Sequence, residues 1–192
     1  MRHRNRSENG FTLIELMLTV ALIGVMSAIA IPNFIAYQAR ARQAEAYTNL
    51  DSLARAYHGY FAESGIYPDM GTRSAEPSLP PAPLLGSKKM SWTNPQDTQD
   101  FFDIVGWGSE GDVYYTYDVV SAESGACTCT GACFTATAHG DVDADGGWSA
   151  LMYAKPQTDA AGAYLGECPS AIGGYFAPKY GEVVWRPGMD RF

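Results

Sequence analysis

One carboxylate lies in an otherwise uncharged apolar stretch of this sequence, and its charge needs a partner. Glu15 is the only charged residue between Phe11 and Ala39, and the next charge is Arg40. A charged carboxylate near the centre of a bilayer costs about 2.5–3.5 kcal/mol, and less near its edge, so such residues usually serve a function. No Lys or Arg lies one helical turn from Glu15. Within one molecule, only the dipole at a helix N-terminus would favour its charge.

The residues around Glu15 are suited to spanning a membrane. Phe11–Ile31 comprises 21 residues, which as a helix would be about 31 Å long, enough to cross the apolar core of a bilayer. Arg2, Arg4 and Arg6 precede this stretch, and arginines beside a first apolar segment hold that end in the cytoplasm. An ordinary secretory signal fits poorly, because no small-residue cleavage site ends the apolar run.

Residues 8–16 resemble the processing site of type IV prepilins and of their relatives, the pseudopilins of type II secretion. The residues that stand where the pattern of this family expects them are Gly10, Phe11, Thr12, Leu13, Ile14 and Glu15, followed by Gly24 and Pro32 where the family's helix loosens or bends. The resemblance covers roughly residues 7–60 and does not extend to the C-terminal two thirds.

The resemblance implies a series of processing and assembly steps. A prepilin peptidase/methyltransferase would cut between Gly10 and Phe11 and methylate the new amine of Phe11, which stays positive. In a helical filament, Glu15 of one chain would meet the Phe11 amine of the next, in a low-dielectric core where a missing partner is costly. The implied protein is a structural subunit of a type IV pilus. It would be inserted in the inner membrane with a cytoplasmic leader and a periplasmic head, and then built into an extracellular filament.

Partners and two alternative functions follow from the same resemblance. The partners would be the peptidase/methyltransferase, identical or related pilin subunits, the inner-membrane assembly machinery and, before assembly, the membrane. The alternatives are a pseudopilin of a type II secretion system and a minor, tip-located pilin that acts as an adhesin or binding module. The N-terminus does not separate pilin from pseudopilin. Glu15 argues against the extreme tip, where no neighbour above needs pairing. The sequence leaves motility, adhesion, DNA uptake and electron transfer open.

The expected fold is α+β and type IV pilin-like, with a long kinked N-terminal helix packed on an antiparallel β-sheet head. The expected parts are a leader at 1–10, a membrane or filament-core helix at 11–32 and a head at 33–192, which consists of a half-helix at 33–63, a loop region at 64–111 and a sheet at 112–192. Pro32 removes a backbone donor and should kink or locally melt the helix.

Periodicity predicts the elements of the head. An apolar stripe at three- and four-residue spacing predicts that the half-helix packs on the head; it consists of Leu50, Leu53, Ala54, Tyr57, Tyr60 and Phe61, with Gly65 and Pro68 at its end. Strands are predicted at Val113–Val120, Cys133–His139, Trp148–Lys155 and Glu182–Arg186. A short helix is expected near Pro95–Val105, and a turn explains Gly106–Gly111 better than a dinucleotide fingerprint does.

Four cysteines lie in the part of the chain that would be exported: Cys127, Cys129, Cys133 and Cys168. An even number outside the cytoplasm predicts disulfides. A Cys127–Cys129 bridge would close a very small ring and is disfavoured. Two pairings remain, Cys127–Cys133 with Cys129–Cys168, or Cys127–Cys168 with Cys129–Cys133. A zinc site that also uses His139 is an alternative, although the C-x-C-x3-C spacing differs from the usual pair of C-x2-C knuckles.

Asp141, Asp143 and Asp145, followed by Gly146, resemble the first half of a calcium-binding loop. Carboxylates at alternate positions can gather around a hard cation such as Ca²⁺. A complete EF-hand would need an acid where Met152 stands. The alternative is an acidic turn between two strands. Apart from this candidate Ca²⁺, no cofactor is expected.

Charge and motif content narrow the classes of function. Loss of residues 1–10 would remove three of the 13 Lys and Arg side chains and one of the 21 acids, leaving a net charge of −10. No basic patch with interleaved aromatic residues appears in the sequence, so nucleic-acid binding by the head is not expected. An enzyme is not expected either, because there is no nucleophile elbow or paired-histidine motif, and His58 and His139 are isolated.

Overall fold

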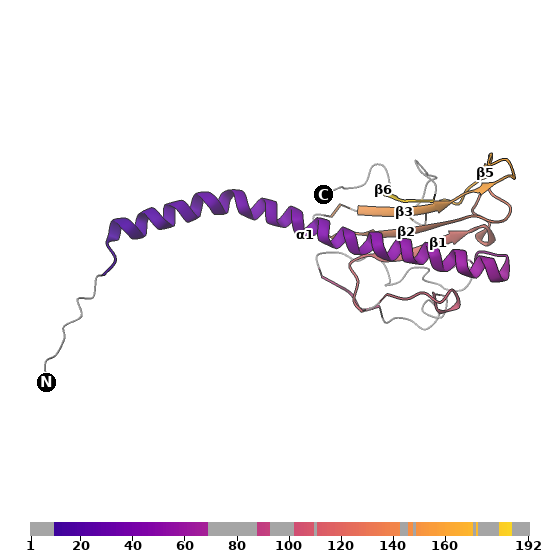
Figure 1. The fold of residues 1–192 in the computed structure, drawn as a ribbon, viewed down its shortest axis with the longest axis horizontal. Helices are drawn as coiled ribbons and strands as arrows, with labels where there is room; N and C mark the ends of the chain where they lie inside the picture. The colour runs from indigo at the N-terminus through magenta and orange to yellow at the C-terminus, as the bar shows by residue number, and fades with distance from the viewer. Residues whose placement is uncertain are drawn as a thin grey trace, which may run out of the picture. The chain divides into compact units, whose positions relative to one another are not determined.

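The computed structural model describes residues 10–68, 88–92, 102–109, 111–142, 146–147, 149–170, 172 and 181–185. The chain divides into two compact units, Met1–Gln38 and Ala39–Phe192. Helix α1, Leu13–Ser64, contributes residues to both units, and the strands belong to the second (Figure 1).

Helix α1 runs for 52 residues without an interruption. Pro32 lies inside it, and the local melting expected at this proline is not seen. In the same turn, Asn33 Nδ2 donates to the carbonyl oxygen of Ile29 at 3.1 Å, which adds a side-chain bond where Pro32 removes a backbone donor. The helix ends as predicted at Gly65, which has a φ of 77° and donates its N–H to Phe61 O. This is a left-handed C-cap of the kind that glycine favours.

A four-stranded antiparallel sheet accompanies the second half of α1, with the strand order β1-β2-β3-β6. Its strands are β1 (Thr116–Ser121), β2 (Phe134–Gly140), β3 (Ser149–Lys155) and β6 (Val183–Trp185). The four predicted strands are therefore confirmed, with ends shifted by a few residues. Strand β1 begins later than predicted because Val113 exchanges backbone hydrogen bonds with Met90 instead.

Three short elements were not predicted. Strands β4 (Gln157–Thr158) and β5 (Tyr164–Gly166) form a small hairpin, and η1 (Ala122–Ser124) is a 3-10 turn that follows β1. Strands of two or three residues are too short to show an alternating pattern. Asp159 closes the hairpin loop, because its Oδ1 accepts hydrogen bonds from the N–H groups of residues 161 and 163 at 2.9 and 2.7 Å.

The predicted short helix and turn lie partly outside the described residues. Residues 102–104 are helical, while 95–101 are not described. Gly106 and Gly111 have φ values of 69° and 87°, which non-glycine residues rarely adopt. These values agree with a turn at this place.

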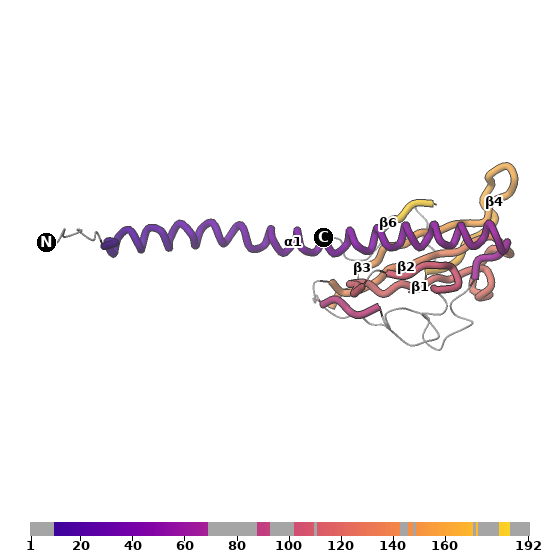
Figure 2. The backbone as a smooth tube through the Cα atoms, turned by 60° about the horizontal axis from the view of Figure 1, so that its bottom comes forward, coloured from indigo at the N-terminus to yellow at the C-terminus, as the bar shows by residue number. Residues whose placement is uncertain are grey.

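One face of α1 packs on the sheet, as Figure 2 shows. The buried residues of the helix are Ala39, Ala46, Leu50, Leu53, Ala54 and Tyr57. Most of them share one buried cluster with residues of β1, β2 and β3, and the ring centroids of Tyr57 and Phe134 are 4.9 Å apart. Tyr60 and Phe61 pack against the cluster while partly buried. The predicted apolar stripe is therefore confirmed.

The opposite face of the sheet is buried as well. Thr116, Thr135 and Thr137 are fully buried, although threonines that alternate with apolar residues are typical of a strand with one wet face. Asp118 and His139 are buried there too, with Oδ2 and Nδ1 3.1 Å apart. Burial raises the pKa of Asp118, and the neighbouring imidazole opposes that rise. Both faces of the sheet are thus removed from water.

The second unit should fold on its own, since the apolar stripe of α1 and the sheet share one core. A fragment that begins at about residue 35 should unfold in one cooperative transition on heating, as small single domains usually do. Circular dichroism against temperature measures this transition. A fragment without a transition would contradict a self-contained core.

The same fragment should lose stability as the pH falls below about 6.5, the ordinary pKa of histidine. His58 is partly buried, with Nδ1 3.1 Å from the Tyr67 hydroxyl oxygen and Nε2 2.9 Å from that of Tyr153. Burial, and then the charge of Lys155, lowers the pKa of His58. Below pH ~6.5 the unfolded chain therefore takes up a proton that the folded chain resists. Stability present above this pH is lost as the pH falls toward the lower pKa of the folded state.

Thermal melts between about pH 7.5 and pH 5.5 bracket this titration. His58→Gln keeps a hydrogen-bonding side chain but removes the titrating ring, so its Tm should fall less over the same range. An equal fall in both proteins would assign the pH dependence to other groups.

Candidate functional site

The N-terminal half of α1 presents an apolar surface on all sides. From Phe11 to Tyr37, sixteen large hydrophobic side chains are 54–82% exposed. A helix that is apolar all round is ordinarily buried in protein or in a membrane, and an exposed apolar surface of this extent marks an interaction site. Among the described residues, α1 is the one helix long and apolar enough to cross a membrane, and none of its most apolar window is buried.

Thr12 and Glu15 form the beginning of α1. Glu15 Oε2 accepts hydrogen bonds from the Thr12 backbone N–H at 3.0 Å and from the Thr12 hydroxyl at 2.6 Å, and the Glu15 N–H donates to Thr12 Oγ1 at 3.3 Å. This is a capping box, in which a threonine before the helix and a glutamate three residues later satisfy each other's exposed groups. This role of Thr12 was not predicted, although T-x-x-E ahead of an apolar run is a sequence signal for a capping box.

The capping box leaves Glu15 with further capacity to accept hydrogen bonds. A carboxylate offers about four lone-pair sites on two oxygens, and the bonds from Thr12 reach Oε2. Both residues are exposed. Glu15 Oε1 can therefore accept from a second donor without breaking the box.

No steric clash within the chain explains why glycine stands at positions 10 and 24. A Cβ placed at either position would meet no heavy atom within 4 Å, and neither glycine has a positive φ. A larger side chain would therefore fit the chain as it stands. Steric fit within the chain therefore gives no reason for glycine at these positions.

The four cysteines form one cluster. Their Sγ atoms all lie within 4.8 Å of one another, and the disulfides join Cys127 to Cys168 and Cys129 to Cys133. This is one of the two pairings that the sequence left open. His139 lies six residues beyond Cys133, about 20 Å along an extended strand, and its ring faces Asp118. A zinc site with His139 is therefore not supported, whereas a site of four sulfurs would use this same cluster.

Contacts between Thr128 and Glu167 bring the segment of Cys127 and Cys129 next to Cys168. Glu167 O accepts hydrogen bonds from the Thr128 N–H and hydroxyl at 2.9 and 3.1 Å, and the Glu167 N–H donates to Thr128 Oγ1 at 3.0 Å. Gly166 permits this approach, because a Cβ there would lie 2.7 Å from Cys129 N. The Cys127–Cys168 bridge spans a sequence separation of 41, and disulfides typically contribute about 2–4 kcal/mol to stability.

In the candidate calcium loop the structure describes Asp141, while Asp143 and Asp145 lie outside the described residues. Asp141 is buried, and its Oδ2 accepts a hydrogen bond from the Gly146 N–H at 3.1 Å. Aspartates often bond to nearby backbone N–H groups in this way in turns. Calcium binding here stays a prediction.

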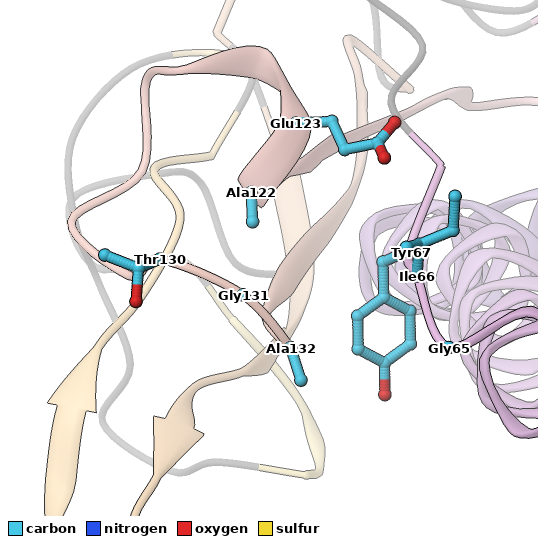
Figure 3. Close-up of a pocket in the computed structure, with 8 residues that line it drawn as sticks. All are labelled: Gly65, Ile66, Tyr67, Ala122, Glu123, Thr130, Gly131 and Ala132. Atoms are coloured by element: carbon cyan, nitrogen blue, oxygen red, sulfur yellow. The ribbon is translucent and has the colours of Figure 1, made fainter.

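A hollow of about 220 Å³ lies between the end of α1 and the segment after β1 (Figure 3). It is lined by Gly65, Ile66, Tyr67, Ala122, Glu123, Thr130, Gly131 and Ala132. Burial and the nearby Tyr153 raise the pKa of Tyr67 to about 12, so its hydroxyl stays neutral. The lining residues include no nucleophile paired with a base, which covalent catalysis would need.

Comparison with known proteins finds a motif and several relatives that match the N-terminal segment. Residues 5–31 match the prokaryotic N-terminal methylation motif. The type IV major pilin protein PilA of Myxococcus xanthus is 55% identical over 65 residues, 34% of this chain and 30% of that protein. The type IV major pilin protein PilE1 of Neisseria gonorrhoeae is 37% identical over 82 residues, 43% of this chain and 49% of that protein. A fimbrial protein of Moraxella nonliquefaciens is 51% identical over 47 residues, 24% of this chain and 30% of that protein.

The chain thus spans less than half the length of each of these relatives. No solved structure matches it. The motif match and the two pilin relatives confirm the resemblance to type IV pilins that Gly10 to Glu15 carry.

The mature protein should contain two disulfides and no free thiol. Intact-mass spectrometry after alkylation without reduction should show no alkylated cysteine. Fragmentation of the linked peptides should join Cys127 to Cys168 and Cys129 to Cys133. Four alkylated thiols, with zinc released on denaturation, would instead show a four-sulfur metal site.

Gly166→Ala should impair formation of the pair of disulfides, because its methyl group would overlap the backbone at Cys129. Gly131→Ala is the matched control, since a Cβ there would meet only Gln157 Nε2 at an ordinary 3.6 Å. Non-reducing peptide mapping of both variants measures the difference. Correct pairing in Gly166→Ala would show that this close approach is not required.

Proposed function

We propose that this chain, whose N-terminal segment belongs to the type IV pilin family, is a structural subunit of a type IV pilus. The peptidase/methyltransferase cuts it between Gly10 and Phe11 and methylates the Phe11 amine, and the N-terminal half of α1 then polymerises. The observation that carries the proposal is the exposed apolar surface of this half-helix, with Glu15 at its beginning.

The apolar surface needs cover that other molecules must supply. Burying one large hydrophobic side chain contributes about 1.5–3 kcal/mol, so sixteen of them gain tens of kcal/mol in a membrane or among other subunits. That gain far exceeds the ~2.5–3.5 kcal/mol that a charge costs in a bilayer. The segment therefore inserts with Glu15 in place, and the membrane is its first partner.

The filament offers Glu15 a polar partner that the membrane lacks. Lipid tails are as apolar as leucine side chains, so hydrophobic burial hardly separates the two environments. After cleavage the Phe11 nitrogen changes from an amide to a cationic amine. The amine of one subunit pairs with Glu15 of its neighbour, which can accept it through Oε1 while the capping box stays closed. An unpaired charge in such a core is costly.

A pilus subunit is favoured over the two alternatives. The relatives described above are named type IV major pilins and a fimbrial protein, and these names favour a pilus over a type II secretion pseudopilin. A minor pilin at the extreme tip would leave Glu15 without a neighbour above it.

The remaining partners and places follow from this function. Identical or related pilins surround the N-terminal helix in the filament, and inner-membrane assembly machinery extracts the subunit. Before assembly the protein crosses the inner membrane once, with its leader in the cytoplasm and its head in the periplasm. Afterwards it lies in an extracellular pilus.

Gly10→Leu should leave an unprocessed membrane precursor and no filament. The chain has room for a side chain at this position, so the effect should arise in the peptidase and not in the fold. Mass spectrometry should show that the wild-type chain begins at N-methylated Phe11, and the same should hold for the control Gly24→Ala. A mature chain that begins elsewhere, for example after Ala28 or Ala30, would overturn the proposal.

Glu15→Ala should be inserted and cleaved but should assemble poorly. Two further variants separate the charge from the helix cap. Glu15→Gln keeps an acceptor for the capping box and loses the charge, while Thr12→Ala loses the box and keeps the charge. The yield of sheared filaments relative to the membrane pool should fall more than ten-fold for Glu15→Gln, since an uncompensated buried charge costs about 3–5 kcal/mol. Thr12→Ala should stay near wild type, and the reverse pattern would show that the cap alone matters.

A further inference from the structure

The four cysteine sulfurs lie close enough together to share one metal ion. The Sγ atoms of Cys127, Cys129, Cys133 and Cys168 all lie within 4.8 Å of one another. Cys168 Sγ lies 3.9 and 3.2 Å from those of Cys129 and Cys133, to which it is not bonded. In a tetrahedral zinc site with Zn–S bonds of about 2.3 Å, neighbouring sulfurs are about 3.8 Å apart. In the reduced chain, side-chain rotations within the cluster would bring all four sulfurs to that spacing.

Contacts that use no sulfur atom hold the cysteines in place. The Thr135 hydroxyl donates to Cys168 O at 2.8 Å, and the hydrogen bonds between Thr128 and Glu167 join the same two segments. Cys133 directly precedes β2, which pairs with β1 on one side and β3 on the other. None of these contacts depends on a disulfide, so they can keep the cysteines together in the reduced chain as well.

The cluster is largely closed to water and offers only sulfur. Cys133, Cys168 and Cys129 are 0, 1 and 7% exposed, and Cys127 is partly buried. Structural zinc sites are closed in this way and have four protein ligands. Thiolates select soft cations, whereas Mg²⁺ and Ca²⁺ prefer oxygen. The three residues between Cys129 and Cys133 also lie within the usual spacing for a pair of zinc ligands. Zn²⁺ is therefore the ion that this set of side chains fits.

We propose that the cysteine cluster, before its oxidation, binds one Zn²⁺ through all four sulfurs. The chain is synthesised with free thiols, and disulfides form in an oxidising compartment. Zn²⁺ displaces the four thiol protons, so that one ion and four thiols give one tetrathiolate site and four protons. The ion joins the segment that follows β1 to the segment of Cys168 until disulfides replace it. This inference concerns the head alone and does not depend on assembly into a pilus.

Oxidation of the site releases the ion. Each bridge forms as two cysteine thiolates give two electrons to a small disulfide, which leaves as two thiolates. Two molecules of this oxidant thus convert four cysteine thiolates into the two bridges and become four thiolates themselves. Bridged sulfurs no longer carry the thiolate charge that binds a metal. The same four side chains therefore hold the head together in two ways, first through Zn²⁺ and then through the disulfides.

The test uses the full mature chain in detergent micelles, reduced by a phosphine, beside the oxidised chain. Competition with a chromophoric chelator should show one Zn²⁺ bound per reduced chain, with a Kd of about 50 nM or below. The oxidised chain should bind no Zn²⁺ at this affinity. Co²⁺, which occupies the same tetrahedral sites as Zn²⁺, should give the thiolate-to-metal absorption of a cobalt tetrathiolate in the reduced chain alone.

Cys127→Ser and Cys168→Ser each remove one ligand, and each should weaken Zn²⁺ binding more than ten-fold. Even loss of a group that only supports a metal ligand costs 10–100-fold in affinity. Every chain is reduced in this comparison, so a missing bridge does not distinguish these variants from the wild type. Thr130→Ala is the matched control, because Thr130 is exposed beside Cys129 and bonds to Gln157 through its backbone N–H. It should keep the wild-type affinity.

Three results would overturn the inference. The first is a reduced wild type that binds no Zn²⁺ at this affinity, or binds it equally well without the sulfur of Cys127 or Cys168. The second is a cobalt complex without thiolate-to-metal absorption, because oxygen or nitrogen ligands would then hold the ion. The third is an equal loss of affinity in Thr130→Ala, which would assign the effect to the fold of the segment. Filament yield is not a readout here, so the proposed pilus function is tested separately.

Discussion

The uncovered apolar half of α1 is the constraint on which the rest of the structure depends. Sixteen large hydrophobic side chains between Phe11 and Tyr37 are exposed, and no stable state in water leaves such a surface bare. The same helix continues past Ala39 with one face buried against a sheet. One continuous element therefore belongs to two environments, a closed protein core and a surrounding that other molecules provide. The head can keep its fold while the surroundings of the apolar half change.

Polar groups, more than apolar area, distinguish the membrane from the filament as surroundings of the N-terminal half of α1. Lipid and neighbouring helices bury the apolar side chains about equally well, so little hydrophobic free energy separates membrane from filament. In the proposed function, Glu15 favours the filament, where a cationic amine can meet it. The capping box between Thr12 and Glu15 holds Oε2 of the carboxylate and leaves Oε1 to accept that amine. In this account, assembly gives Glu15 a charged partner that it lacks in the membrane.

Local patterns in the sequence predicted much of this architecture. The α1 stripe and the four sheet strands depend on spacings of a few residues, which sequence displays directly. The burial of Asp118 against His139, the approach of Lys89 to Glu45 and the choice between two disulfide pairings depend on contacts between distant segments, so no local pattern carries them. Pro32 shows the converse, because a long helix tolerates a residue whose local preference is to interrupt it.

The most direct test of this account is a reconstruction of the assembled filament by electron cryo-microscopy at side-chain resolution. It would measure the distance from the Glu15 carboxylate to the Phe11 amine of the neighbouring subunit. The account predicts an N–O distance within about 4 Å, that of an ion pair, with the Thr12 capping box intact in each subunit. A Glu15 that contacts only its own Thr12, with the neighbour's amine beyond reach, would contradict it.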